Sequence, residues 1–269
     1  MQRSHIIVII LLVAAAVVLV LVARQMDNPQ GEEVTGLDEL LEAGRSSLEA
    51  GAYDAAVTEL EAAVEMDPGS SQAHFLLGQA YNRQGELLKA ADEFRTVIAL
   101  DPENAAAHHN LGVTYFQLQD PGAAVAEFET ALRLDPDDPD SHYQLGATYL
   151  VLALSGADPM AAPDPQLLAQ ATDEFEAALQ LEEDMPEALI GMGNVYIQQG
   201  DFAAAVKALE RAIEQMPTSP EAHYALGEAY AQSGDTAGAC ETFGRFLELN
   251  PPSTWQAQAE QVMTALQCP

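Results

Sequence analysis

The chain contains 269 residues, of which ten are lysine or arginine and 42 are aspartate or glutamate, so its formal charge is −32 at pH 7. A nucleic-acid backbone is held by a footprint of basic side chains, and this chain has only two lysines, Lys89 and Lys207. Nucleic acid is therefore excluded as a partner. We interpret the acidic excess as solvated helix surfaces, with a trap for cations or basic peptides and a saline habitat as alternatives.

The N-terminus carries an apolar run from Ile6 to Ala23 that contains no charged residue. Eighteen residues span about 27 Å as an α-helix, which is close to the hydrocarbon thickness of a bilayer. A cleaved signal peptide is the alternative, but its apolar core is usually shorter and precedes a small-residue cleavage site, whereas Ala23 runs directly into Arg24. The pattern predicts an uncleaved transmembrane signal anchor at residues 1–24, with residues 6–23 in the membrane.

Charges beside this run bear on its orientation. Arg3 and the terminal amine slightly outweigh Arg24, so the positive-inside tendency favours an N-terminus inside the cell. Residues 25–36 are polar and contain proline and glycine, which predicts a short linker. We therefore expect a single-pass protein of a bacterial inner membrane with its main domain on the periplasmic side. A cytoplasm-facing domain is the alternative.

From residue 37 onward a 34-residue pattern occurs six times, with glycine at its eighth place and alanine at its twentieth. The copies, called repeats one to six below, are residues 37–70, 71–104, 105–138, 139–185, 186–219 and 220–253. Apolar residues spaced three and four apart predict two helices in each repeat, which we call the first and second helix. Glycine inside a helix costs about 1 kcal/mol relative to alanine, so its recurrence predicts that the two helices cross closely.

This pattern resembles the tetratricopeptide repeat (TPR) family, which has a small residue at place eight, an aromatic at eleven, alanine at twenty and proline at thirty-two. The clearest copy runs from His74 to Pro102. Departures are histidine or leucine in place of tryptophan at place four, Ser47 in place of the aromatic in repeat one, and Glu183 in place of proline in repeat four. The resemblance implies an all-α fold, a right-handed α-solenoid of six helix-turn-helix units.

Repeat four is longer than the others, with 47 residues rather than 34, and its 13 additional residues fall between its two helices. The segment from Ala153 to Gln166 contains Pro159, Pro163 and Pro165, so we predict a loop that continues neither helix and projects from an edge of the solenoid. Its role has two equal alternatives, a contact for a partner or an insertion without function that costs little stability.

Residues 254–269 are expected to form a capping helix, because the last repeat of a solenoid leaves an apolar face uncovered. Five apolar side chains recur on one helical face of this segment: Trp255, Ala259, Val262, Met263 and Leu266.

The two cysteines of the chain lie near this cap. Cys240 is early in the second helix of repeat six and Cys268 ends the capping segment, so antiparallel packing would bring them together. We hypothesise a disulfide between them, which fits an oxidising compartment. Two free thiols are the alternative.

Four histidines stand at place four of their repeats and raise the question of a metal site: His74, His108, His142 and His223. Equivalent places in stacked helix pairs are on the order of 10 Å apart, whereas the ligands of one ion all lie about 2 Å from it. We therefore predict that these rings pack or hydrogen-bond between repeats and hold no metal. The sequence contains no recognisable serine elbow, cysteine–histidine pair or phosphate loop, so we expect no catalysis and no cofactor.

In the TPR family the first helices line a concave groove, and the resemblance places the following residues in it: Phe75, Gln79, Asn82, His109, Asn110, Val113, Phe116, Tyr143, Gln144, Ile190, Asn194, Ile197 and Tyr224, together with Arg45 and Arg83. An aromatic, aliphatic and amide lining suits an extended or helical peptide, and the acidic field favours a neutral or basic one. We expect Phe75, Phe116, Tyr143 and Ile197 to be exposed to the ligand. Incidental apolar residues on a stiff spacer are the alternative.

The resemblance thus implies a membrane-anchored scaffold or chaperone-like adaptor that binds peptide segments, in the assembly or maturation of envelope protein complexes. A cytoplasm-facing regulatory or signalling module and a holder of apocytochromes in cytochrome c biogenesis are the alternatives. The lysines with which some members of the family grip acidic C-termini are absent from the predicted groove.

Overall fold

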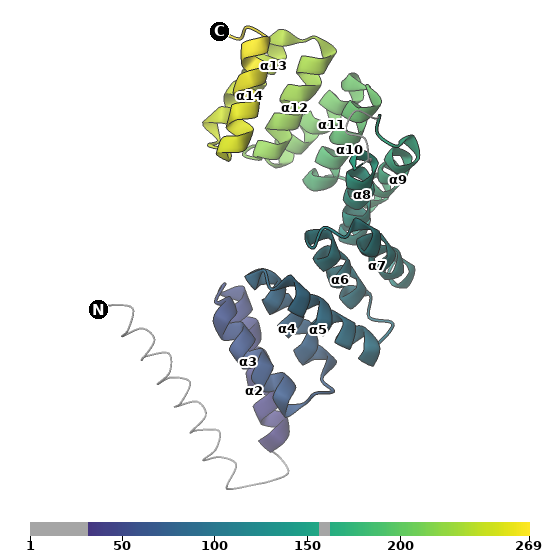
Figure 1. Cartoon of the computed structure of the whole chain (residues 1–269), viewed down its shortest axis with the longest axis vertical. Coiled ribbons are helices and arrows are strands. Elements are labelled where there is room, and N and C mark those ends of the chain that lie inside the picture. The colour runs from purple at the N-terminus through teal and green to yellow at the C-terminus, as the bar shows by residue number, and fades with distance from the viewer. Residues whose placement is uncertain (1–31, 156–161) are drawn as a thin grey trace, which may run out of the picture. The chain divides into compact units, whose positions relative to one another are not determined.

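The computed structural model describes residues 32–155 and 162–269, so the predicted anchor at residues 6–23 lies outside the described residues. The described residues form thirteen α-helices and no strand (Figure 1). Within these ranges no helix has both the length and the apolar character that a membrane crossing needs. The helices divide into an N-terminal part that ends at Asn110 and a C-terminal part that begins at Leu111, and each part is described by itself.

The N-terminal part contains two complete helical hairpins. Its helices are α2 (Glu32–Glu49), α3 (Tyr53–Met66), α4 (Ser71–Gln84) and α5 (Leu87–Leu100), followed by the start of α6 (Ala105–Gln117). Helix α2 pairs with α3, α4 pairs with α5, and α4 also contacts both helices of the first hairpin. Because α2 begins at Glu32, the prediction of a linker over 25–36 was wrong for its last five residues. Gly36 is buried, and a Cβ atom there would lie 3.3 Å from the Met66 side chain of α3.

The C-terminal part continues the same arrangement with the rest of α6 and eight further helices. These are α7 (Pro121–Leu134), α8 (Pro139–Leu154), α9 (Pro165–Leu181), α10 (Pro186–Gln199), α11 (Phe202–Gln215), α12 (Pro220–Ser233), α13 (Thr236–Glu248) and α14 (Ser253–Ala265). The hairpins are α8–α9, α10–α11 and α12–α13, and each contacts the next along the chain (Figure 1). The first helices α8, α10 and α12 also contact one another in sequence, so they form one continuous layer.

The glycine at place eight is required by the close crossing of the two helices. A Cβ atom on Gly78 would lie 2.8 Å from the ring of Phe94, and one on Gly227 would lie 2.8 Å from the ring of Phe243. The same contact recurs at Gly44 with Leu60, Gly112 with Phe128, Gly146 with Phe175 and Gly193 with Leu209. These leucine and phenylalanine partners are fully buried. Because glycine has no Cβ atom, these large core side chains can pack against its backbone. The predicted close crossing is confirmed.

The turn between the two helices of a repeat uses a residue with left-handed backbone. Gly85 and Gly200 cap α4 and α10 with φ of 80° and 79°. Repeat three has Gln119 at the same place, with φ of 61°. A side chain with a Cβ atom is disfavoured there by about 1 kcal/mol or more, so repeat three is locally less well adapted than its neighbours.

The insertion in repeat four extends both of its helices. Helix α8 runs through Leu154 and α9 begins at Pro165, so the prediction that Ala153 to Gln166 continue neither helix was wrong at both ends. Pro165 occupies the first helical position, where the missing N–H needs no partner. The Asp164 carboxylate caps α9 by accepting from the N–H of Gln166 at 2.8 Å. The backbone N–H of Asp164 donates to the Ala153 carbonyl at 3.1 Å.

Helix α14 covers the last repeat, as predicted. Ala259 is fully buried, and the other four predicted residues pack around Phe243 and Phe246 of α13. A disulfide joins Cys240 of α13 to Cys268, with the Cα atoms 5.5 Å apart. The bond fastens the end of the chain that follows α14 to the second helix of repeat six.

Candidate functional site

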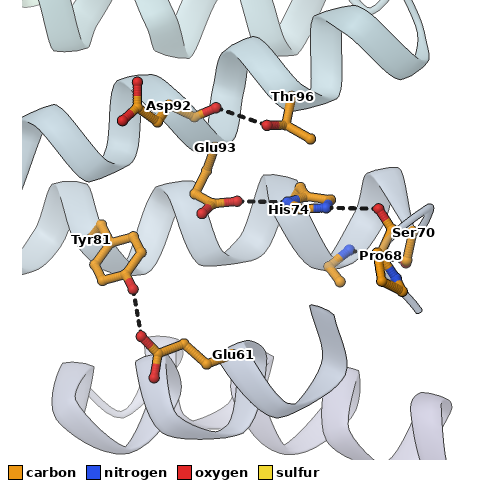
Figure 2. A network of polar contacts seen from close by, with 9 residues as sticks. Glu61, Pro68, Ser70, His74, Tyr81, Asp92, Glu93 and Thr96 are labelled. Carbon is orange, nitrogen blue, oxygen red and sulfur yellow. Dashed lines mark hydrogen bonds and ion pairs between the residues drawn. The ribbon is translucent and has the colours of Figure 1, made fainter. Parts of the chain in front are cut away.

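The histidines at place four bridge elements within the fold. The Nδ1 atom of His74 lies 2.6 Å from the Glu93 carboxylate and its Nε2 lies 3.1 Å from the Pro68 carbonyl (Figure 2). His142 repeats the pattern with Glu174 at 2.6 Å and the Pro136 carbonyl at 3.1 Å. Each ring therefore joins the segment before its own helix to the second helix of the same repeat.

The other two histidines of this set also bond to the backbone, His108 to the Pro102 carbonyl at 3.3 Å and His223 to the Ser219 carbonyl at 2.9 Å. The prediction of packing and hydrogen bonding is confirmed for all four. Within residues 32–155 and 162–269, no group of three or more metal-binding side chains is arranged to hold an ion.

The tyrosines at place eleven link one repeat to the next through a glutamate. The Tyr81 hydroxyl donates to Glu61 at 2.6 Å (Figure 2), and the corresponding pairs, Tyr149 with Glu129 and Tyr230 with Glu210, are both at 3.0 Å. Burial first, and then the neighbouring glutamate, raises the pKa of Tyr149 and that of Tyr230 to about 12. The phenols therefore stay neutral donors at physiological pH.

Sequence reasoning identified the aromatic at place eleven as part of the repeat pattern but missed its glutamate partner. The signal was available, because in each pair the glutamate precedes the tyrosine by 20 residues. These contacts hold one repeat on the next and leave the outer surface of the first helices for other roles.

The predicted groove residues fall into both parts of the chain. Phe75, Gln79, Asn82, His109 and Asn110 belong to the N-terminal part, and the remaining eight belong to the C-terminal part. The layer of α8, α10 and α12 brings together six of them, namely Tyr143, Gln144, Ile190, Asn194, Ile197 and Tyr224. This layer is the candidate functional site, and we call its outer side the first-helix surface.

The aromatic residues on the first helices are less exposed than predicted. Phe75, Phe116 and Tyr143 are half-buried and Ile197 is only 5% exposed, so the expectation that these four are exposed was wrong. The reason for Phe75 and Tyr143 lies in the glycine contacts, since the aromatic at place five packs on the phenylalanine that fills the space beside the glycine. Ile197, at place twelve, is buried in a cluster that includes Leu209 and Leu226. The ring of Phe75 is 5.8 Å from that of Phe94, and the ring of Tyr143 is 6.2 Å from that of Phe175.

The two predicted amide contacts differ in availability. The Asn110 amide donates to the Ala106 carbonyl of its own helix at 2.8 Å. The Asn194 side chain on α10 makes no hydrogen bond to any described residue, and it lies between the first helices of repeats four and six. Asn194 is therefore the better placed of the two to bond a ligand.

The basic side chains of the C-terminal part all lie on second helices, whereas carboxylates lie on both kinds of helix. The four basic residues are Arg133, Lys207, Arg211 and Arg245, on α7, α11 and α13. Arg211 and Arg245 are already engaged there by Asp184 at 3.2 Å and Glu241 at 3.6 Å. The first helices α8, α10 and α12 carry carboxylates and no lysine or arginine.

Two carboxylates approach aromatic residues on this surface. Burial, followed by the nearby Glu187 of α10, raises the pKa of Tyr143 on α8. On α12, Glu228 lies half-buried beside Tyr224, and its burial raises the pKa of the Glu228 carboxyl although a hydrogen bond with the Tyr224 hydroxyl opposes the shift. Glu228 stands at place nine, a groove position, but it was missing from the predicted set.

Four family profiles match the chain. One described as "TPR repeat" matches residues 115–151 and 193–234, and three described as "Tetratricopeptide repeat" match residues 41–105, 166–212 and 220–253. Together they cover most of the six repeats, and the chain belongs to the tetratricopeptide repeat family. No curated protein sequence matches it.

Solved structures share the fold at low sequence identity. The pilF structure from Pseudomonas aeruginosa is 21% identical with a TM-score of 0.69, and the match covers 85% of this chain and 99% of that one. PilW, a widely conserved type IV pilus biogenesis factor, is 15% identical with a TM-score of 0.70, covering 82% and 97%. YrrB, a TPR protein with an unusual peptide-binding site, is 21% identical with a TM-score of 0.56, covering 75% and 97%.

Proposed function

We propose that this protein is a non-catalytic scaffold or chaperone-like adaptor that binds a neutral or basic peptide segment of a partner protein on its first-helix surface. The observation that carries the proposal is the segregation of the basic side chains. Carboxylates, aromatic rings and an unbonded amide are placed on α8, α10 and α12, and every basic side chain of the C-terminal part lies on a second helix. A cationic segment on this surface would meet carboxylates and no lysine or arginine, whereas on α11 and α13 it would meet basic side chains as well.

Two of the similar structures support this kind of role. PilW is described as a pilus biogenesis factor and YrrB as a protein with a peptide-binding site. We infer from them a role in the assembly or maturation of envelope protein complexes, with the bound segment belonging to a component that is waiting to be incorporated.

We further propose that the protein is anchored in a bacterial inner membrane by residues 6–23, with the repeats on the extracytoplasmic side. The uncharged run from Ile6 to Ala23 supports the anchor, and the disulfide between Cys240 and Cys268 supports an oxidising compartment over the cytoplasm. Anchoring would concentrate the binding surface where envelope components emerge from the membrane.

Photo-crosslinking tests the binding surface directly. A photoreactive phenylalanine is introduced at Gln198 of α10 or Gln232 of α12, both exposed on first helices, and at the matched positions Gln180 of α9 and Glu214 of α11, both exposed on second helices. We expect a discrete partner adduct from the first pair in native membranes and none from the second. Equal adducts from both pairs, or none from either, would remove the first-helix surface as the binding site.

Topology is tested separately by fusing, after residue 269, a reporter enzyme that is active only outside the cytoplasm. Activity of the fusion in a bacterial host supports the proposed orientation. An inactive fusion, together with an active one made with a cytoplasmic reporter, would place the repeats in the cytoplasm and overturn the proposed location without affecting the peptide-binding proposal.

A further inference from the structure

We propose that Glu228, Tyr224 and Trp255 form an anchor site for one lysine or arginine side chain of the bound peptide. The site lies on α12 at the end of the first-helix surface, where the capping helix α14 adds its tryptophan. This inference rests on the proposed function, since it identifies the chemistry that the same surface recognises.

The aromatic part of the site is already assembled in the chain. The ring of Trp255 lies 5.8 Å from that of Tyr224 and stacks on Phe246 at 6.4 Å, and Tyr224 also packs edge-on against Phe246 at 5.4 Å. Trp255 and Tyr224 are half-buried, so each ring keeps an accessible part. Because three rings and the disulfide-fastened α14 fix this wall, little side-chain freedom is lost when a ligand binds to it.

The carboxylate of the site has no cationic partner of its own. Glu228 lies one helical turn from Tyr224 on α12, so the two side chains are neighbours on one face of that helix. Helices α8, α10, α12 and α14 contain no lysine or arginine, and Arg245 of α13 is paired with Glu241 at 3.6 Å. Holding a carboxylate partly out of water without an opposite charge is unfavourable, and a cation from a ligand would offset that cost.

The combination selects a cation over other ligands. Aromatic faces attract ammonium and guanidinium groups through the ring quadrupole, and the adjacent carboxylate supplies the opposite charge. An acidic side chain would meet repulsion from Glu228, and an apolar one would leave the carboxylate covered and unpaired. Burial raises the pKa of the Glu228 carboxyl, which agrees with a carboxylate placed where water alone solvates it poorly.

A random library of displayed 12-residue peptides provides the probe for the test. The full chain, with its disulfide intact, is panned against the library beside two variants that each remove one negative charge. Glu228→Gln alters the proposed site, whereas Glu214→Gln removes an exposed charge from the second helix α11 of the same part. We expect one lysine or arginine to be enriched at a fixed position in peptides selected on the unmodified chain and on Glu214→Gln, but not on Glu228→Gln.

The binding constant of a selected peptide is then measured through Trp255, which is the only tryptophan of the chain. Saturable change of its emission reports occupancy of this site. At physiological salt, where the Debye length is about 8 Å, Glu228→Gln should weaken binding about ten- to hundredfold and Glu214→Gln no more than about twofold. Thermal unfolding of both variants checks that the fold is intact.

The outcomes separate the anchor from the proposed function. Three results would overturn the anchor while peptide binding stands. The selected peptides could lack a basic residue, bind Glu228→Gln as well as the unmodified chain, or leave the Trp255 emission unchanged. Equal weakening by both variants would show that the general field of the protein is responsible and would overturn it too. If no peptide is enriched on any of the three proteins, peptide recognition itself fails and the anchor with it.

Discussion

The buried interfaces between helices, called the seams below, differ from the first-helix surface of repeats four to six in how regularly their residues repeat. In the seams the same contacts recur from repeat to repeat, such as the glycine that faces a leucine or phenylalanine and the tyrosine that donates to a glutamate. On the surface most positions differ between repeats, and place nine is Ala147, Asn194 and Glu228 in repeats four, five and six. The recurring contacts account for stability, and we proposed the varying surface as the place of recognition, so mutations in the two regions should separate these properties.

Loss of the disulfide should lower stability more than any single substitution in the seams. The bond closes a segment of 28 residues, and a cross-link of that length stabilises a fold by about 3 to 4 kcal/mol through the unfolded chain. We expect the double variant Cys240→Ser, Cys268→Ser to unfold at lower urea concentration, with Trp255 emission, which follows α14, changing first. A reducing agent should reproduce the effect in the unmodified chain and do nothing to the variant, and matching unfolding curves in all cases would contradict it.

The next test compares two glycines of repeat six that differ in their surroundings. A Cβ atom at Gly227 would meet Phe243 at 2.8 Å, whereas one at Gly244 of α13 meets nothing within 4 Å. Gly227→Ala should therefore destabilise the protein by about 1 to 3 kcal/mol through overpacking, and Gly244→Ala should stabilise it by about 1 kcal/mol through helix propensity. Urea unfolding followed by circular dichroism measures both, and the same sign for the two changes would refute the close-crossing explanation.

The tyrosine–glutamate pairs make a smaller contribution that depends on pH. Tyr149→Phe removes a hydrogen bond of 3.0 Å to Glu129 and should cost about 0.5 to 1.5 kcal/mol at pH 7. The folded state raises the pKa of Tyr149 from 10.0 to about 12, so the stability that the phenol contributes is complete below pH 10 and is lost as the pH rises toward 12. The variant should lose less stability than the unmodified chain over that interval, and parallel curves would show that the pair does not contribute.

The fold could be predicted from the sequence because its determinants are periodic. The glycines at place eight and the apolar stripes each recur six times, so chance agreement is negligible and the helix pairs follow. The ends of α8 and α9 could not be predicted in this way, since Pro165 can either break a helix or begin one. The choice depends on the Asp164 cap and on the contact of Asp164 with Ala153, which is set by folding of the whole repeat.

The site was less predictable, because exposure is decided by neighbours that are distant in sequence. Family resemblance placed Tyr143 and Ile197 on first helices but predicted too much exposure, since the packing of Tyr143 on Phe175 and of Ile197 in its cluster is visible only in three dimensions. Glu228 resembled any other carboxylate in an acidic chain. Its distinct environment arises from its burial beside Tyr224, whose ring lies 5.8 Å from that of Trp255 on α14.

The smallest expected effect on stability has the opposite sign to all the seam mutations. Burial raises the pKa of Glu228 above its ordinary value of 4.5, so the folded chain binds more protons than the unfolded chain over the interval between the two values. The contribution of Glu228 to stability therefore declines as the pH rises through that interval, and the ionised group is unfavourable at pH 7. Glu228→Gln should raise the midpoint of thermal unfolding at pH 7 and should flatten its decline above pH 4.5.

A residue that only supports the fold would lower stability when it is replaced. A side chain whose replacement stabilises the protein while weakening the binding of a cationic peptide is retained for recognition, at a cost in stability. Glu214→Gln, on an exposed second-helix position, should change neither property beyond the general effect of one charge. If Glu228→Gln destabilises the chain at pH 7, Glu228 supports the fold as the seam residues do. The separation of stability from recognition then fails on α12.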